Sequence, residues 1–409
     1  METPVLSTLF APRKLGPLTL RNGFIRSAAF EGMTPGHMVS NQLIDYHMSV
    51  ARGGVGMTTV AYAAVSKTGL SFSHQLWLRK EAVAGLRQLT DSIHAEGALA
   101  SIQIGHCGNM GNSKVIGARP LAPTSRINLY GPTFPRRMNA QDMEDVVADF
   151  ANAVRLADEA GFDAVEVHAG HGYLISQFLS PYTNSRTDEY GGSFENRSRF
   201  MRRVLSAIKQ ALPPHMAFIV KMNSWDGFKG GIVREEALLT ATIIEECGAD
   251  AIVVSGGFVS RAPMYVMRGR IPKKPMIHYM TEQWKAFFIA LVGDLLIGNE
   301  PYKEGFFLKE ALEIQRVIKI PVIAVGGMNS VKIIADAAEK GIQFVAMARA
   351  LIEDPAFINK LKNGQIQQSE CTLCNFCVAK MYSETMTCQL HDPSVPAALK
   401  IGLNDLRNG

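Results

Sequence analysis

Short apolar runs of strand length alternate with longer amphipathic stretches along most of this 409-residue chain. The runs are continuous in β-branched and other apolar residues, a pattern typical of parallel strands that are buried on both faces. They predict eight strands, at residues 24–29, 55–61, 98–104, 164–168, 218–222, 251–255, 322–325 and 344–347.

The amphipathic stretches between these runs predict eight helices, at residues 42–51, 82–95, 141–159, 196–210, 234–247, 308–317, 330–340 and 355–362. Glycine follows several of them, as at Gly161 and Gly341, where a helix C-cap before a short turn is expected. Eight strand–helix units predict an α/β protein with a (β/α)8 TIM barrel. An open doubly wound sheet is the alternative, but no G-x-G-x-x-G pattern follows the first strand.

Three segments fall outside the strand–helix rhythm. The first 20 residues, with Gly16-Pro17, predict a hairpin that caps the bottom of the barrel. Long loops near 107–140 and 257–307 follow strand ends, where barrels build their sites, so we expect lids or oligomer contacts there. The predicted domains are a barrel at 1–364 and a cysteine-rich extension at 365–409.

Composition narrows the class of protein. The net charge of +5 comes from interspersed charges of both signs, so no nucleic-acid partner is expected.

Residues 1–5 lack the features of a signal peptide. The most apolar window, 284–298, contains Lys285 and Asp294 and is too short for a membrane span. It predicts a buried or oligomer-facing helix, and a homo-oligomer without stable membrane insertion.

Six cysteines occur in the chain, and four of them lie within residues 371–388. They are not spread like a disulfide framework. This distribution indicates a reducing, cytoplasmic environment.

Two imidazoles and a phenol follow the predicted strand at 164–168. His168, His171 and Tyr173 would lie at the C-terminal end of a barrel strand, where active sites of this fold occur. A metal site would need a third ligand, and a structural role is open for either histidine alone. A pair that holds a substrate oxygen, together with a proton donor, accounts for all three residues.

The last two strands carry a phosphate-binding pattern. Gly326 and Gly327 end the seventh strand before a helix, and Ala348-Arg349 ends the eighth. Backbone N–H groups, a helix N-terminus and an arginine favour a phosphate, and loops after strands 7 and 8 are its usual place in this fold. The alternative is a tight turn beside a surface arginine.

Gln103 and Lys221 end the third and fifth strands. A planar heteroaromatic ring at the mouth of the barrel would need an amide to hydrogen-bond with its edge and a cation to stabilise negative charge on it. Gln103 and Lys221 supply these groups. Gln103 could instead be an interior polar group. Lys221 could instead be a Schiff-base nucleophile, as in an aldolase.

The block H-A-G-H-G-Y-L-I-S-Q-F-L-S-P-Y-T-N-S-R-T-D-E-Y-G-G-S-F-E-N-R-S-R-F at 168–200 closely resembles the old yellow enzyme family of FMN-dependent oxidoreductases. The resemblance covers roughly residues 5–363 and includes residues 9–12, 18–22, 51–56, 102–106, 325–327 and 348–352. It implies FMN at the barrel mouth, bound by Ser27, Ala28, Ala29, Gln103, Lys221, Gly326, Gly327, Ala348 and Arg349.

The resemblance also implies a reaction. NADH or NADPH would reduce the FMN, and the flavin would then pass a hydride to an α,β-unsaturated carbonyl compound. His168 and His171 would hold the substrate oxygen, and Tyr173 would protonate the α-carbon. Lys221 stands where the family usually has arginine, and Phe30 where threonine or cysteine is common. A Schiff-base aldolase using Lys221 and a non-catalytic flavin electron carrier remain as alternatives.

The tail contains Cys371, Cys374, Cys377 and Cys388 in a C-x2-C-x2-C-x10-C spacing. Four thiolates in such a spacing can bind an iron–sulfur cluster or zinc. The motif resembles the tail of the dienoyl-CoA reductase and trimethylamine dehydrogenase branch, which binds a [4Fe-4S] cluster and continues into a second flavin and nucleotide domain. A cluster, zinc and no metal all remain open.

Overall fold

The structure is a computed structural model that describes residues 4–128, 132–383 and 385–402. Residues 1–3, 129–131 of the first long loop, 384, and 403–409 of the predicted extension lie outside the described residues. Eight parallel strands close a barrel in which the last strand pairs with the first. They are β3 (Phe24–Arg26), β4 (Met57–Ala64), β5 (Leu99–Gly105), β8 (Ala164–His168), β9 (Ala217–Asn223), β10 (Ala251–Ser255), β11 (Val322–Ala324) and β12 (Phe344–Met347). The predicted TIM barrel is confirmed.

The apolar strands bury both of their faces. Every residue of β4, β8, β9 and β10 is buried. In β8, Val165 and Val167 pack outward in the larger core beneath the helices, whereas Ala164 packs inward. Side chains alternate along a strand, so Glu166 and His168 share the inward face with Ala164. One strand thus carries an apolar outer face and a polar inner end.

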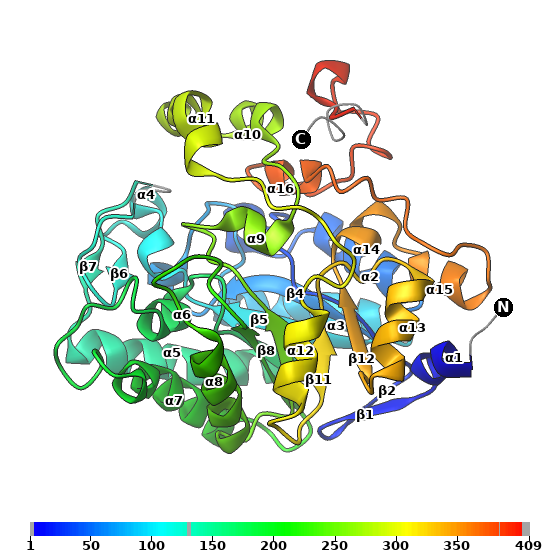
Figure 1. Cartoon of the computed structure of the whole chain (residues 1–409), viewed down its shortest axis with the longest axis horizontal. Coiled ribbons are helices and arrows are strands. Elements are labelled where there is room, and N and C mark those ends of the chain that lie inside the picture. The colour runs from blue at the N-terminus through cyan, green and yellow to red at the C-terminus, as the bar shows by residue number, and fades with distance from the viewer. Residues whose placement is uncertain (1–3, 129–131, 384, 403–409) are drawn as a thin grey trace.

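Helices cover the outside of the barrel (Figure 1). The eight that were predicted are α2 (Asn41–Arg52), α3 (Val83–Ala95), α5 (Ala140–Glu159), α7 (Phe194–Ala211), α8 (Arg234–Glu246), α12 (Leu308–Gln315), α13 (Val331–Glu339) and α15 (Phe357–Lys362). Polar side chains fix several of their starts: Asn139 forms a capping box with Asp142 on α5, and Ser330 accepts from the backbone N–H of Ile333 on α13. Two short helices, α6 (Leu174–Leu179) and α14 (Arg349–Glu353), begin near the strand ends.

The N-terminal segment closes the bottom of the barrel. Helix α1 (Pro4–Phe10) precedes the antiparallel hairpin of β1 (Arg13–Leu15) and β2 (Leu18–Leu20). Leu15, Leu18 and Leu20 pack in the inner core of the barrel. The predicted capping hairpin is confirmed.

The two long loops contain structure of their own. The first holds α4 (Ser113–Ile116) and the short paired strands β6 (Leu121–Ala122) and β7 (Arg136–Arg137). The second holds α9 (Pro263–Met267), α10 (Lys273–Tyr279) and α11 (Gln283–Leu296). Figure 1 shows α10, α11 and the tail helix α16 (Phe376–Lys380) together at the end opposite the hairpin.

The predicted apolar helix at 284–298 forms α11, but it is buried on one face only. Ala286 and Ile289 pack against Met276 and Met280 of the α10 region. On the other face, Trp284, Phe287 and Leu291 are 49%, 71% and 72% exposed. None of the helices within the described ranges is long and apolar enough to cross a membrane.

Candidate active site

The C-terminal ends of the strands enclose a cavity of about 270 Å³. It contains every residue that the sequence predicted for catalysis or cofactor contact, and two of the four tail cysteines. These residues are Ser27, Ala28, Ala29, Gln103, His168, His171, Tyr173, Lys221, Gly326, Gly327, Ala348, Arg349, Cys371 and Cys377. The fold therefore gathers side chains from six strand ends and the tail around one space.

His168 ends β8 and is buried. Its Nδ1 accepts a hydrogen bond from the backbone N–H of Gly170 at 3.4 Å, which places the ring proton of the neutral imidazole on Nε2. Burial, followed by the neighbouring His171 and Lys221, holds the pKa of His168 well below its usual value. At neutral pH this residue is a neutral hydrogen-bond donor.

His171 is placed by a tight turn. It adopts a left-handed backbone conformation with φ of 56°, and Gly172 follows with φ of 78°. A Cβ at Gly172 would lie 2.5 Å from the ring of Phe258, so only glycine fits. The Nε2 of His171 lies 2.7 Å from the Oγ of Ser255, and burial lowers its pKa to about 3. The second imidazole is thus also neutral and held in orientation.

Tyr173 packs against two aromatic rings of the cavity, those of His168 and Tyr62. Its ring centroid is 4.1 Å from that of His168 and 4.9 Å from that of Tyr62. Burial is the main cause that raises the pKa of the phenol. The hydroxyl therefore keeps its proton at neutral pH until a stronger base takes it.

A buried carboxylate that the sequence reasoning missed connects Gln103 with Lys221. The Oε1 of Glu166 accepts from the Nε2 of Gln103 at 2.6 Å and lies 2.8 Å from the Nζ of Lys221. All three side chains are almost fully buried. A charged residue in an apolar strand, two positions before His168, was the signal that could have revealed it.

The loop after β11 has the geometry that close contact with a ligand needs. Gly326 and Gly327 have φ of 97° and 74°, and a Cβ on either would come within 3.0 Å of neighbouring atoms. Arg349, after β12, donates to the Oδ1 of Asn375 in the tail at 2.8 Å. The Nδ2 of Asn375 in turn donates to the carbonyl oxygens of Arg268 and Arg270. Sequence reasoning missed Asn375, and nothing in the pattern linked it to Arg349.

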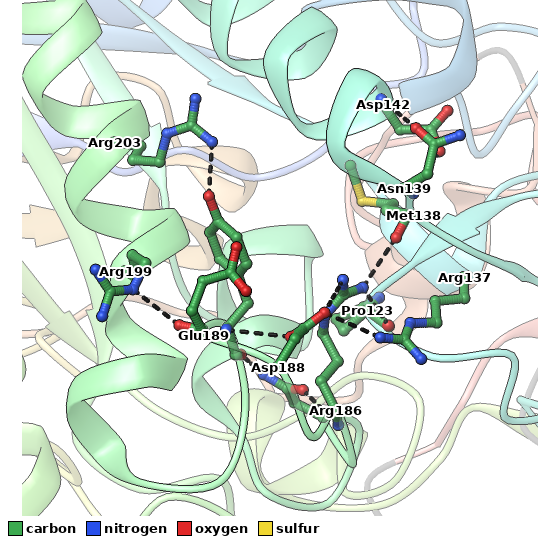
Figure 2. Close-up of polar contacts among 12 residues, drawn as sticks. Pro123, Arg137, Met138, Asn139, Asp142, Arg186, Asp188, Glu189, Arg199 and Arg203 are labelled. Carbon is green, nitrogen blue, oxygen red and sulfur yellow. Dashed lines mark hydrogen bonds and ion pairs between the residues drawn. The ribbon is translucent and has the colours of Figure 1, made fainter.

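The second half of the 168–200 block is structural. Figure 2 shows Arg186 in a bidentate ion pair with Asp188, at 2.9 and 2.6 Å. The same guanidinium donates to the carbonyl oxygens of Pro123 and Met138 in the first long loop. This ion pair lowers the pKa of the Asp188 carboxyl to about 2. Arg186 thus fastens the 107–140 loop to the barrel.

Arg186→Ala is expected to lower the free energy of unfolding by about 2–4 kcal/mol, since it leaves two buried carbonyls without their donor and breaks a partly buried ion pair. Asp188 would keep Arg137 and the backbone N–H of Tyr190 as donors. Equilibrium urea unfolding measures the change. Arg199→Ala is the matched control. Arg199 is exposed and donates to the carbonyl oxygen of Glu189 at 2.8 Å and to the Oδ1 of Asn196 at 3.3 Å, so its loss should cost under about 0.5 kcal/mol. Equal effects from the two variants would contradict the role of Arg186.

The four tail cysteines line one small cavity of about 20 Å³. Burial raises the pKa of Cys377 to about 12 and that of Cys388 to about 11. In residues 4–128, 132–383 and 385–402, no three or more histidine, cysteine or acidic side chains are arranged so that they could hold a metal ion. The thiols are therefore neighbours, but their present arrangement is not that of a ligand set.

Comparison with known proteins identifies the family. The family model "NADH:flavin oxidoreductase / NADH oxidase family" matches residues 8–290. A 4,4'-dithiodibutanoate disulfide reductase of Rhodococcus erythropolis is 40% identical over 97% of this chain and 98% of its own length. An NADH oxidase of Thermoanaerobacter brockii is 31% identical over 90% of this chain, which spans only 52% of that enzyme.

A solved structure supports the same assignment at the level of the fold. The old yellow enzyme homologue of Zymomonas mobilis superposes with a TM-score of 0.70 and 21% identity, over 88% of this chain and 94% of that one. Together with the cavity at the barrel mouth, these matches confirm the resemblance that the 168–200 block suggested. The chain belongs to the NADH:flavin oxidoreductase / NADH oxidase family and is a flavin-dependent oxidoreductase with the old yellow enzyme fold.

Proposed function

We propose that this protein uses NADH or NADPH and bound FMN to reduce the activated C=C bond of an α,β-unsaturated carbonyl compound, with Tyr173 as the proton donor. The observation that carries the proposal is the pairing of two neutral imidazoles with a protonated phenol in one cavity. In such a substrate, the carbonyl oxygen would accept hydrogen bonds from the imidazoles, and the α-carbon would take the proton of the phenol.

The residues present fit an FMN. Two glycines that leave no room for a Cβ and the guanidinium of Arg349 line the cavity and suit its phosphate. The amide of Gln103 and the ammonium of Lys221 suit the edge of the flavin ring. When bound, FMN would supply the hydride that the substrate accepts. The site would take up one hydride from the nicotinamide and one proton for each alkene that it reduces.

The residues of the chain have distinct tasks. The N–H groups of His168 and His171 would hold the carbonyl oxygen and draw electron density from the alkene. The hydroxyl of Ser255 would donate to the Nε2 of His171, which fixes that ring and leaves its one N–H, on Nδ1, for the substrate. The phenol of Tyr173 would give its proton to the α-carbon and recover one from solvent.

Reduction of a disulfide is a second candidate function, because the relative that matches along nearly the whole chain is a disulfide reductase. In that reaction, one disulfide, one NAD(P)H and one proton give two thiols and NAD(P)⁺. The Schiff-base alternative is not favoured, because Lys221 lies 2.8 Å from the Glu166 carboxylate and an attack by its nitrogen on a carbonyl would break this buried ion pair.

Anaerobic turnover tests the proposed function. Purified protein should show a flavin absorption spectrum and should oxidise NADH or NADPH when 2-cyclohexenone is added, with cyclohexanone as the product. 4,4'-dithiodibutanoate replaces the enone in a parallel assay for disulfide reduction. Turnover with the disulfide alone would move the assignment to the second candidate. A flavin protein that reduces neither probe would support the non-catalytic carrier, and a protein that takes up no FMN would contradict all three.

We also propose that Cys371, Cys374, Cys377 and Cys388 bind a metal as a set, because four cysteines share one cavity and a metal ion would offset the cost of ionising buried thiols. We expect bound iron or zinc in anaerobically purified protein, measured by elemental analysis, with acid-labile sulfide only in the case of a cluster. Cys371→Ser should lose the metal, and Cys247→Ser, outside the tail, should keep it. Protein that is metal-free, or that loses its metal in both variants, would contradict the set.

A further inference from the structure

A second cavity adjoins the first at the proposed proton donor. This chamber has a volume of about 280 Å³. Five residues line both spaces: Tyr173, Val266, Met267, Val378 and Met381. The chamber is therefore the neighbour of the first cavity along these residues.

The walls of the chamber are rich in methionine and come from both long loops and the tail. They include Met110, Met264, Met267, Met276, Met280 and Met381. Methionine is apolar, unbranched and flexible, so such walls adapt to chains of different shape. Phe72 and Tyr382 add an edge-to-face aromatic pair at 5.8 Å. The surface thus suits an apolar and flexible guest.

The composition of the chamber lining disfavours an anionic guest. Among the described residues that line it, none is a lysine or arginine, and the single carboxyl belongs to Glu282. The neighbouring Arg268 lies outside the lining, 3.3 Å from Glu300 and over the ring of Tyr265 at 4.2 Å. A carboxylate or phosphate moved into this space would lose its hydration without gaining a cation, which is costly.

We propose that the chamber binds the uncharged, flexible hydrocarbon part of the substrate, whose reducible group lies beside Tyr173. The proposal rests on the proposed function and specifies its substrate class: linear enals, enones or disulfides with neutral apolar tails. Under this proposal, the chamber does not favour 4,4'-dithiodibutanoate, because that molecule carries a carboxylate at each end.

A matched series of substrates tests the class. 2-Hexenal, 2-octenal and 2-decenal differ only in chain length, and a ten-carbon 2-enal with a terminal carboxylate differs from 2-decenal only in charge. We expect kcat/KM to rise by about fourfold for each methylene that the chamber buries. The carboxylate should lower kcat/KM at least tenfold. A value independent of length, or equal for the charged and neutral ten-carbon enals, would overturn the proposal.

Variants at Met110, which lines the chamber and not the first cavity, localise the effect. Met110→Trp should remove the advantage of 2-decenal over 2-hexenal and leave 2-hexenal turnover unchanged. Met110→Lys should raise kcat/KM for the carboxylate enal to within about threefold of the value for 2-decenal. Leu239→Lys, on the exposed surface of α8, is the control and should change neither ratio. A chain-length advantage that survives Met110→Trp would place the tail elsewhere and contradict the proposal.

A binding measurement separates this proposal from the proposed function. Titration calorimetry of the flavin-loaded protein with 1-decanol and with decanoate needs no turnover. Decanol should bind at least tenfold more tightly, and Met110→Trp should weaken it by a similar factor. If no enal is reduced but decanol binding follows this pattern, the reaction is wrong and the chamber assignment stands. Equal affinities for decanol and decanoate would overturn the chamber assignment whatever the reaction.

Discussion

Tyr173→Phe is expected to slow the reduction of an enone by about 10²–10⁴-fold and to leave the reduction of the flavin by NADH unchanged. The phenol keeps its proton in the buried site and would supply it to the α-carbon of a substrate held by His168, whose ring centroid lies 4.1 Å from that of Tyr173. Stopped-flow spectroscopy that follows the two half-reactions separately measures both rates.

Tyr62→Phe is the control for this variant. Tyr62 packs edge-on against Tyr173, and its hydroxyl hydrogen-bonds to the Tyr173 phenol and lies 2.9 Å from the Oγ of Ser71. The Tyr62→Phe substitution therefore removes a neighbour of the proton donor but leaves the donor itself in place. Loss of the Tyr62 hydroxyl should change the rate of enone reduction by less than about tenfold. The disulfide probe gives a further distinction, because a thiolate can leave without a proton. An unaltered rate of enone reduction in Tyr173→Phe would remove Tyr173 from the mechanism, while an unaltered rate with a disulfide is expected.

Glu166→Ala is expected to lower the free energy of unfolding by about 3–5 kcal/mol at neutral pH. The substitution leaves the ammonium of Lys221 buried without its carboxylate and removes the acceptor of the Gln103 amide. Equilibrium urea unfolding measures the loss. It should be accompanied by a lower FMN content, because Gln103 and Lys221 would no longer be held in position.

A double variant shows whether the lost stability comes from the unpaired charge. Glu166→Leu with Lys221→Met removes both charges and should recover most of the stability that Glu166→Ala loses. Asp336→Ala breaks an exposed ion pair with Lys340 and should cost under about 0.5 kcal/mol. A loss below about 1 kcal/mol in Glu166→Ala would mean that Lys221 finds another partner or becomes neutral.

The barrel and its polar mouth were predictable from the sequence for a physical reason. Strands such as β9 and β10 are buried on both faces, so their apolar runs stand out against the amphipathic helices. The carboxyl ends of parallel strands converge at one end of a barrel. Polar residues at strand ends, such as Gln103 and His168, were therefore expected to meet, and they line one cavity.

The contacts that join distant segments were not predictable. Glu166 could be recognised as an inward residue, but its bond to Gln103 spans 63 positions. The bond from Arg349 to Asn375 depends on how the tail crosses the barrel mouth. The 257–307 loop forms three helices that pack near the tail, and the sequence contains no repeat or strand register from which this packing could be predicted. Local patterns specify elements, whereas these contacts follow from the arrangement of the whole fold.

The pairing of β3 with β12 has a consequence for how the chain is made. Phe24 to Arg26 align with Val345 to Met347, so the barrel cannot close until the ribosome has released almost the whole barrel sequence. Until then, Leu15, Leu18 and Leu20 lack Phe344, with which they share the inner core. Nascent chains therefore carry this apolar segment uncovered through most of synthesis, the period in which aggregation competes with folding and chaperones act.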